Sequence, residues 1–583
     1  MTTRPDATQD APRWQILVSP ELHPYWRDAL RRSGLPTASL DDVTPAQAAA
    51  SVLALPDTSH HPSPTLRRQI RVLMDAGVPV VACADAAAAL QGHREAKTRR
   101  VLGVSQVTPL LAADDLVRLD SEVRVPPYAA LGTCWPSRDA AVAWSLAGAR
   151  CVVALPLPDA DAAMATGGKR QAFALDDQRT AFEFASRCDH GAVRRLLVGA
   201  LRWVAHRRGL PFAYLGPAPG LALGTFALRI DADDFDANAT ETLLQRLTAV
   251  DARATWFIDV ERHANKGGAP WIQRMLDAGQ DVQSHGYHHY TYSRTDRNLD
   301  NFARSVALLR QWGAAPNAAA APFGSWNHGL QAAFAELGFI YSSEFGRIHD
   351  DHPALLPTAD VPPLWQVPVH PVCPAIAREA GLTPAEISAY LAGVVRTKLA
   401  RGEPAIVYGH PIRDLDGCPN LLTTLAATLA DHERAGGGTI WRATLGEVLA
   451  FYRERANQEI ECRWHQRHLE VDSGDGPAAV WVEAPGAPVE RVRGRAVIPA
   501  DTATDAPTDA PTDAAAAVPE LACRRHCDVV APLGWEPHVR QRTARVAARI
   551  RLARMWREVK TARRSAPSTS PSSRWRRTVD HKT

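Results

Sequence analysis

The feature that most limits the fold of this chain is a run of alternating strand-like and helix-like segments between residues 224 and 454. Its apolar, extended segments are GTFALRI, ATWFIDV, QDVQSHG, FIYSSEF, LWQVPVH and EPAIVYGH, and helix-like sequence separates them. Such alternation is typical of α/β domains with parallel strands. A run of about 230 residues suits a closed or nearly closed (β/α) barrel, in which polar residues at strand carboxyl ends carry the function.

An earlier stretch, residues 14–165, shows the same alternation. Its strand-like segments are WQILVS, SVLALP, VPVVAC and ARCVVALPLP. They predict a separate α/β domain with a mainly parallel sheet, which we place at residues 14–190. The amphipathic segment 193–209 predicts a connecting helix that ends at a glycine, the residue favoured just after a helix.

The rest of the chain predicts smaller parts. Residues 455–500 indicate a small β appendage, and the Ala/Thr/Asp/Pro-rich residues 501–519 a linker that cannot bury a core. Residues 520–583 predict a basic amphipathic helix and a disordered tail. This helix is either solvated against its own protein or attracted to a polyanion or to anionic lipid, which would give peripheral contact with a membrane. CRRHC at 523–527 would be a candidate metal site, although a lone CxxxC with one histidine usually has no such role.

Charge and composition narrow the class of protein. The 583 residues carry a formal net charge of only +3, which does not favour a specific nucleic-acid partner. No apolar run approaches the roughly 20 residues that cross a bilayer, and the polar N-terminus lacks the apolar core of a secretory signal. The nine cysteines are scattered without a CxxC pair. These features predict a reduced, cytoplasmic protein.

Acidic residues end the first strand of the second series. The apolar run FALRI is followed by Asp231, Asp233, Asp234 and Asp236. Buried carboxylates are costly without a positive partner, and a metal would supply that charge. Because Asp231 and Asp233 project to the same side of an extended segment, one could coordinate while the other stays free as a base.

Histidines follow two strands later. In DVQSHGYHHY (281–290), His285 and His289 are spaced i, i+4, and His288 between them points elsewhere. Two neutral imidazoles and one carboxylate leave open positions for water and substrate, as in catalytic metal sites. HxxxH alone is weak evidence, but after a strand-end DxD within an alternating pattern it predicts a metal centre.

On these motifs, residues 224–453 resemble the polysaccharide deacetylases with a NodB homology domain, carbohydrate esterase family 4. RIDADD matches the family's aspartate motif, and HGYHH matches H(S/T)xxH with Gly286 in the Ser/Thr place. AAPFG (320–324) matches RxPxG, YSSEFG (341–346) resembles the fourth region, and IVYGH the fifth, a strand ending in histidine. The resemblance implies a distorted (β/α) barrel of the NodB type over residues 222–454.

The resemblance also implies roles for the matched residues. Asp231 would be the general base that activates a metal-bound water, and His410 the general acid that protonates the leaving group. Asp233, His285 and His289 would hold the metal, commonly zinc in this family, with cobalt or nickel as alternatives.

Substrate would meet the residues of the third motif. Phe323 with its neighbouring backbone amides would border the oxyanion pocket, Pro322 of the same motif would contact the substrate, and Trp326 would stack on a sugar ring. Donors of this kind stabilise a tetrahedral intermediate.

The chain departs from the family pattern at two places. Ala232 separates the two aspartates, so either Asp233 or Asp234 is the ligand, and strand alternation favours Asp233. Ala320 stands where the family has an arginine that orients the base, and Arg229 or Arg347 would have to substitute. His370, at the end of another strand, is a further candidate near the site, although a lone histidine is more often structural.

The N-terminal domain resembles the flavodoxin-like fold of class I glutamine amidotransferases, in which a strand-end cysteine is the nucleophile. Cys83 falls near that place in VPVVACAD. VACAD lacks the glycine-flanked turn that such a nucleophile requires. We therefore expect a non-catalytic module for contact or regulation.

The leading hypothesis for the whole chain is a metal-dependent hydrolase that removes an N-acetyl or O-acetyl group from an amino sugar or glycan. Cleavage of another C–N bond, in a small amide, is a second hydrolase interpretation. The alternative from another class is a catalytically silent sugar-binding or scaffold protein that keeps the deacetylase fold.

Overall fold

The computed structural model of the protein describes residues 11–57, 63–91, 97–105, 110, 117–125, 130–135, 140–147, 150–165, 167–176, 178–356, 358, 360–411, 415, 417–465, 468–485 and 487–499. All of them belong to one compact unit, residues 1–524. The predicted linker, the CRRHC sequence and the basic C-terminal helix lie outside the described residues.

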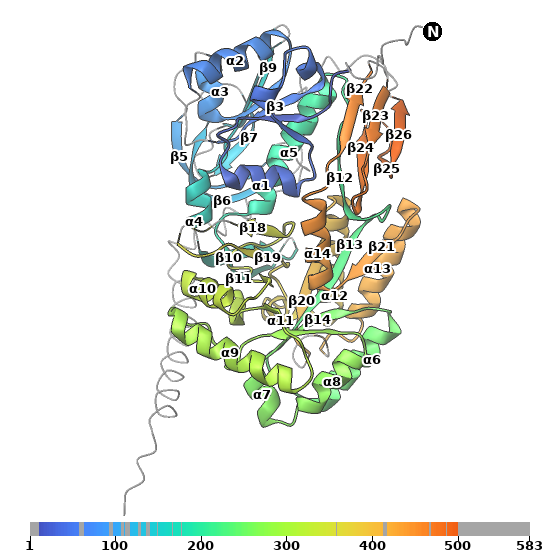
Figure 1. Ribbon diagram of the computed structural model, residues 1–583. Coiled ribbons are helices and arrows are strands. Elements are labelled where there is room, and N and C mark those ends of the chain that lie inside the picture. The colour runs from blue at the N-terminus through green and yellow to red at the C-terminus, as the bar shows by residue number, and fades with distance from the viewer. Residues whose placement is uncertain are drawn as a thin grey trace, which may run out of the picture. The chain divides into compact units, whose positions relative to one another are not determined.

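The N-terminal domain is built on a mixed sheet with the strand order β2-β1-β3-β4-β9-β8-β7-β5-β6 (Figure 1). Its strands are β1 (Ile16–Val18), β2 (Thr37–Ser39), β3 (Val52–Leu55), β4 (Val80–Cys83), β5 (Lys97–Ser105), β6 (Val117–Val125), β7 (Ala130–Trp135), β8 (Ala140–Ala147) and β9 (Arg150–Leu155). Its helices are α1 (Pro24–Arg32), α2 (Pro64–Asp75), α3 (Ala84–Gln91), α4 (Ala160–Ala165) and the long α5 (His190–Arg207). As predicted, α5 is followed by a glycine, Gly209, with φ of 65°.

The expectation of a mainly parallel sheet holds for half of this domain. The strands β2, β1, β3, β4 and β9 pair in parallel, whereas β9, β8, β7, β5 and β6 pair antiparallel. The antiparallel half was not predicted, because the sequence at 97–147 alternates less clearly between apolar and polar residues.

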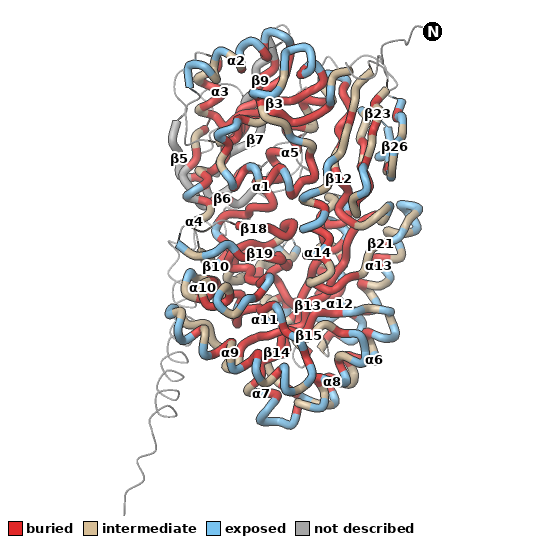
Figure 2. Tube along the Cα trace, viewed as in Figure 1, coloured by how far each residue is buried: buried red, intermediate tan, exposed pale blue. Residues whose placement is uncertain are grey.

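Residues 224–443 form a second, largely parallel sheet with the order β18-β19-β17-β16-β15-β14-β13-β20, to which β21 adds on β13. The strands are β13 (Gly224–Ala232), β14 (Ala254–Ile258), β15 (Asp281–Ser284), β16 (Ala318–Ala319), β17 (Tyr341–Ser342), β18 (Ala354–Leu356), β19 (Leu364–Gln366), β20 (Ala405–Gly409) and β21 (Ile440–Ala443). Every residue of β13 is buried, as Figure 2 shows for the centre of this sheet.

Helices surround the second sheet and connect its strands (Figure 1). They are α6 (Ala237–Ala249), α7 (Val260–Asn265), α8 (Ala269–Asp277), α9 (Thr295–Gln311), α10 (His328–Glu336), α11 (Pro374–Glu379), α12 (Pro384–Ala400), α13 (Leu421–Gly436) and α14 (Leu445–Arg455), with the short 3-10 helix η3 (Pro322–Gly324). Capping boxes at Thr383 and Thr444 begin α12 and α14, so local hydrogen bonds fix where both helices start.

The predicted barrel is not closed by strand pairing among the described residues. After β19 the chain continues as VPVHPVCP, and only the His370 amide donates a hydrogen bond to β20, at 2.9 Å to the Ile406 carbonyl. Pro368, Pro371 and Pro374 have no amide hydrogen to donate. These prolines prevent a continuous ladder between β19 and β20, so the sheet stays open there.

The segment 455–499 forms two small sheets rather than a separate appendage. The strands β22 (Glu461–Trp464), β23 (His468–Asp472) and β26 (Arg495–Pro499) make one of them. In the other, β24 (Ala478–Glu483) pairs with β25 (Glu490–Val492) and with β12 (Phe212–Pro219), the strand that follows α5.

A hairpin of β10 (Gly168–Ala174) and β11 (Thr180–Ser186) lies with the second sheet, although its sequence falls within the predicted N-terminal domain (Figure 1). Phe173, Ala181 and Ala185 of the hairpin belong to the same apolar cluster as Leu228 and Ile230 of β13. The boundary predicted at residue 190 therefore assigns this hairpin to the wrong core.

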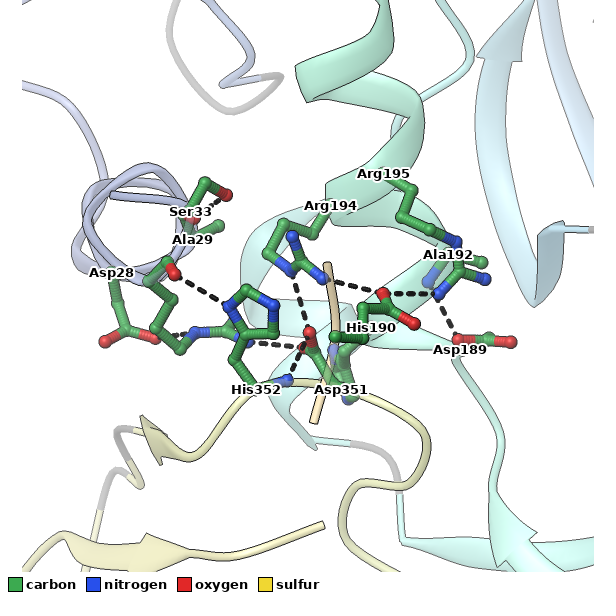
Figure 3. A network of polar contacts seen from close by, with 12 residues as sticks. Asp28, Ala29, Ser33, Asp189, His190, Ala192, Arg194, Arg195, Asp351 and His352 are labelled. Atoms are coloured by element: carbon green, nitrogen blue, oxygen red, sulfur yellow. Dashed lines mark hydrogen bonds and ion pairs between the residues drawn. The ribbon is translucent and has the colours of Figure 1, made fainter. Parts of the chain in front are cut away.

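Buried ion pairs join the two domains (Figure 3). Asp351, in the loop before β18, accepts hydrogen bonds from Arg32 of α1 and from Arg194 of α5, the latter at 2.7 Å. Arg194 also donates to Glu403 at 2.8 Å, and His352 contacts the Arg32 carbonyl at 2.7 Å. Because these groups are buried, each charge depends on its partners across the junction.

Within the described part of the chain, no helix combines the length and the apolar character that crossing a membrane requires.

Candidate active site

Asp233, His285 and His289 converge at the carboxyl ends of β13 and β15. The Nε2 atoms of His285 and His289 lie 3.2 and 3.1 Å from the same carboxylate oxygen, Oδ1 of Asp233. Their ligand atoms all lie within 4.8 Å of one another, close enough to bind one metal ion. The structure thus brings together the three residues that the sequence predicts as metal ligands.

The hydrogen bonds of His285 test whether this group fits a cation. Its Nδ1 lies 2.7 Å from the Ala320 carbonyl oxygen, which can only accept, so Nδ1 carries the proton. In the neutral ring Nε2 then presents a lone pair to the Asp233 carboxylate. Two acceptors at 3.2 Å repel each other unless a cation lies between them, and a carbonyl partner on Nδ1 is the usual support of a metal-binding histidine. The donor set fits a divalent metal such as zinc.

The two predicted acid–base residues lie beside this group. His410, which follows β20, places Nε2 3.7 Å from the other Asp233 oxygen. Asp231 lies two residues before Asp233 on β13 and interacts electrostatically with His285 and His410. Asp231 is buried, whereas the side chains of His289 and His410 are 18% and 17% exposed and so remain accessible to a substrate.

Arg229 holds the Asp231 carboxylate in a two-pronged ion pair. Its Nε donates to Oδ1 and its Nη2 to Oδ2, both at 2.6 Å. The guanidinium lies 5.3 Å from the ring centroids of both Phe257 and Tyr408, and it donates to the Ser343 carbonyl. Burial would raise the pKa of Asp231, but Arg229 overcomes this effect and keeps it below its ordinary value. Of the two arginines considered in place of Ala320, Arg229 is the one that meets the base.

The residues that the sequence left as alternative site residues interact with other groups in the structure. Asp234 lies 2.7 Å from the Lys266 ammonium, so Asp233 is the aspartate that faces the histidines. Arg347 stacks 4.3 Å over the Trp326 ring. His370 bonds to Asp350 at 3.0 Å and to the Tyr390 hydroxyl at 2.9 Å, within the buried charges of the domain junction.

One of the predicted substrate-binding residues of the third motif is exposed to solvent. Phe323 is 56% exposed, has φ of 62°, and packs edge-on against His289 at 4.8 Å. A positive φ is strained for a bulky residue, and such strain is concentrated at functional sites. Pro322 is buried.

Trp326 does not fit the stacking role predicted for it. Only 8% of the residue is exposed, Arg347 covers one ring face, and Nε1 donates to Gln331 at 3.0 Å. The ring therefore has no open face for a sugar, and Phe323 is the exposed aromatic side chain beside the histidines.

Two buried acidic residues near the site were not predicted from the sequence. Glu344 accepts a hydrogen bond from the Ala321 amide at 3.0 Å and so fixes the segment that carries Phe323. Asp259 ends β14 and interacts electrostatically with His289 and Asp233. Burial raises the pKa of both groups to about 7. A polar residue at a strand end was the available signal for Asp259, while Glu344 lies in the fourth motif region.

Comparisons with known proteins agree with this geometry. Residues 225–342 match the family model described as polysaccharide deacetylase. A search of curated proteins finds no match to the chain. The match spans Asp231, Asp233, His285 and His289, while His410 lies beyond it.

Solved structures show weaker likenesses. A family 4 carbohydrate esterase from Streptomyces lividans is 18% identical, with 37% of this chain and 91% of that chain covered and a TM-score of 0.28. A family 4 acetyl xylan esterase from Clostridium thermocellum is 17% identical, with 39% and 90% covered and a TM-score of 0.28. A mutant of the peptidoglycan deacetylase PdaC from Bacillus subtilis is 15% identical, with 40% and 93% covered and a TM-score of 0.29. At such TM-scores these likenesses support no conclusion on their own.

The chain therefore has a mixed α/β fold, and its residues 225–342 match a polysaccharide deacetylase domain. Such a domain implies a hydrolase that acts on carbon–nitrogen bonds other than peptide bonds.

Proposed function

We propose that this protein is a metal-dependent hydrolase that removes an N-acetyl or O-acetyl group from an amino sugar or glycan. The observation that supports it most directly is the approach of two imidazole nitrogens to one Asp233 oxygen, while the Nδ1 of His285 donates to the Ala320 carbonyl and turns Nε2 toward that oxygen. Zinc is the metal that we expect, with cobalt or nickel as alternatives.

In this proposal each site residue handles the substrate or a proton. A divalent cation, when bound, supplies positive charge that makes water more acidic and polarises the acyl oxygen. Asp231 takes the proton of the attacking water, whose oxygen bonds to the acyl carbon. His410 gives a proton to the leaving nitrogen or oxygen as its bond to that carbon breaks. The products are a carboxylate and a free amine or hydroxyl.

Arg229 and Phe323 prepare the reaction. The paired guanidinium keeps Asp231 ionised and fixes its orientation, so the base is ready to accept a proton. Phe323 offers an exposed aromatic face beside His289, suited to the apolar face of a sugar ring.

The N-terminal domain, in our proposal, takes no part in amide transfer. The Cys83 thiol is fully buried and donates to the Asp57 carbonyl at 3.0 Å. Burial raises its pKa to about 12, which keeps it protonated and a poor nucleophile. The likeness to class I amidotransferases stays a prediction about the fold alone.

Metal stoichiometry tests the proposal first. Plasma mass spectrometry of the wild type after zinc, cobalt or nickel loading should give about one equivalent, as expected for a single site. A His285→Ala/His289→Ala double variant should lose it, whereas His288→Ala, a matched control in the same loop, should keep it. Acetate release from N-acetylated chito-oligosaccharides should follow the metal. A wild type that binds no metal would favour a silent sugar-binding protein instead.

A further inference from the structure

The turn that carries Phe323 combines backbone strain with exposure. Phe323 has φ of 62° and is 56% exposed, and the following Gly324 has φ of 57°. Ala320 and Ala321, at the start of the turn, are buried. A bulky residue keeps a positive φ only where the surrounding contacts enforce it. The contacts that hold residues 320–324 therefore decide where the exposed ring lies.

The first peptide group of this turn is held at both ends. Its carbonyl oxygen, on Ala320, accepts a hydrogen bond from Nδ1 of His285 at 2.7 Å. Its N–H, on Ala321, donates to Oε1 of Glu344 at 3.0 Å. Because Ala321 and Glu344 are both buried, removing the carboxyl group would leave a buried amide without a partner.

The two residues after Glu344 hold the other end of the turn. The Phe345 ring lies so close to Gly324 that a side chain at this glycine would have no room. The Gly346 amide donates to the Gly324 carbonyl at 2.8 Å. Residues 344–346, which we call the clamp, therefore contact the turn on both sides of Phe323.

The clamp is itself fixed by close contacts. The Ser186 amide of β11 donates to the Phe345 carbonyl at 2.8 Å. A Cβ added at Gly346 would be 2.7 Å from the Gly324 carbonyl oxygen, closer than packed atoms allow. The clamp and β11 both lie outside the part of the chain that matches the family model. The support of the turn is thus a property of this chain that the match does not describe.

We propose that Glu344 is a positioning residue for Phe323 and that the clamp thereby determines how tightly the protein binds a sugar ring. The proposal rests on the function proposed above, in which Phe323 meets the apolar face of the substrate. The Phe323 ring packs edge-on against His289 at 4.8 Å. Once the Ala321 amide loses its acceptor, the turn is free to relax to an ordinary φ, and the ring leaves its place beside His289.

Glycan binding to the metal-free full chain tests the proposal without turnover. Glu344→Leu removes the acceptor but keeps much of the volume, whereas Glu344→Gln keeps an oxygen that can accept from Ala321. In isothermal titration calorimetry with tri-N-acetylchitotriose, Kd should rise roughly 10-fold in Glu344→Leu, the loss expected for one aromatic contact. Glu344→Gln should stay within about 3-fold of the wild type. An unchanged Kd in Glu344→Leu would overturn the proposal.

A double-variant cycle separates positioning from a merely structural role. Phe323→Ala should raise Kd by about the same factor, and adding Glu344→Leu should then change it less than about 2-fold, because the ring that Glu344 positions is gone. Additive losses would contradict the proposal. Gly346→Ala disturbs the clamp from its other end and should also raise Kd, which gives the same test if Glu344→Leu fails to fold.

Glu433→Leu is the matched control. Oε1 of Glu433 accepts a hydrogen bond from the backbone amide of Ile440 at 2.8 Å, the same type of contact at the start of β21. Because β21 pairs with residues 224–227 of β13, at the opposite end of that strand from Asp231, this variant should bind the glycan like the wild type.

Amide hydrogen exchange needs neither ligand nor metal. Measured by mass spectrometry, peptides covering residues 318–324 should lose protection in Glu344→Leu and keep it in Glu433→Leu, because only the first variant removes the acceptor of the Ala321 amide. Unchanged protection in Glu344→Leu would contradict the clamp. If exchange changes as expected but the wild type binds no glycan, the proposed function fails, whereas the positioning of the turn by Glu344 stands.

Discussion

Two pairs of nearby aspartates, each with one buried and one partly buried member, have different surroundings in this protein. Asp350 and Asp351 both pair with cationic side chains, Asp350 with Lys398 at 3.0 Å and Asp351 with Arg194 at 2.7 Å. Asp231 has a guanidinium partner in Arg229, whereas Asp233 is faced by histidine nitrogens.

The difference separates a structural site from a chemical one. At the junction, permanently charged arginines pair with Asp351, and the gain is the attachment of one domain to the other. Around Asp233, the partners are groups that can be neutral and can bind a metal, and three of the side chains keep some access to solvent. Asp233 thus differs from Asp351, because its partners can bind a metal whereas those of Asp351 are fixed cations.

The largest expected effect is the loss of the base. Asp231 is the proposed base, and Asp231→Asn should lower kcat roughly 10³-fold or more, about 4 kcal/mol in activation free energy, because the amide cannot take the proton of water. Metal content, measured by plasma mass spectrometry, should stay at the wild-type level. Unchanged turnover in this variant would exclude Asp231 as the base.

At the junction the same type of change should act on stability instead. Asp351→Asn removes the buried carboxylate that Arg32 and Arg194 share, although Asp28 and Glu403 remain as their partners, and the free energy of unfolding should fall by about 3 kcal/mol. Urea unfolding followed by circular dichroism measures it. Asp296→Asn, which removes an exposed ion pair with Arg294, is the matched control and should leave stability unchanged.

Arg229→Lys tests whether the charge of Arg229 or its two-pronged geometry matters to Asp231. Lysine keeps the charge but not the fork that binds both Asp231 oxygens, so the base should be misoriented and kcat should drop roughly 10–100-fold. Arg253→Lys alters a similar two-pronged pair with Glu447 on the surface and should not affect turnover. A wild-type kcat in Arg229→Lys would mean that charge alone suffices.

The junction should also be sensitive to acid. Burial would raise the pKa of Asp351, but Arg32 and Arg194 hold it below its ordinary value, and the same holds for Glu403 with Arg195. Groups with a depressed pKa stabilise the folded state above the unfolded pKa of about 4 and lose this contribution as the pH falls. Unfolding at about pH 7, 5 and 3 should therefore show a steeper loss below about pH 4 in the wild type than in Asp351→Asn.

The smallest effect is expected at Cys83, which ends the parallel strand β4 at a place where nucleophiles are often found. Cys83→Ala should leave acetate release within about 2-fold of wild type and cost about 1 kcal/mol of stability, because it only removes a buried sulfur. A Cys83→Ala variant that loses ammonia release from glutamine would show instead that the N-terminal domain is an active amidase.

Local pattern explains what the sequence could reveal. The predicted site residues are polar residues at the ends of apolar segments: Asp231, Asp233, His285, His289 and His410. They lie together in the structure because the carboxyl ends of parallel strands meet at one edge of the sheet. The parallel strands β3, β4 and β9 were predicted on the same basis.

Long-range contacts explain what the sequence could not reveal. Arg32 and Asp351 are 319 positions apart, and nothing in either neighbourhood indicates the other. The hairpin was assigned by its position in the chain, although its apolar residues belong to the later core. The burial of Trp326 depends on Arg347, whose direction follows from tertiary packing.

The polar contacts at the domain junction affect how the protein unfolds. Arg455, at the end of α14, donates to the carbonyls of Arg32, Leu215 and Gly216, in addition to the ion pairs of Asp351. Melting the N-terminal domain alone would break the ion pairs of Asp351 and Glu403 with their arginines and divide an apolar cluster that both halves share, so neither half gains by unfolding first. The described unit should melt in a single cooperative calorimetric transition, and the deacetylase sheet produced without the preceding residues should not fold.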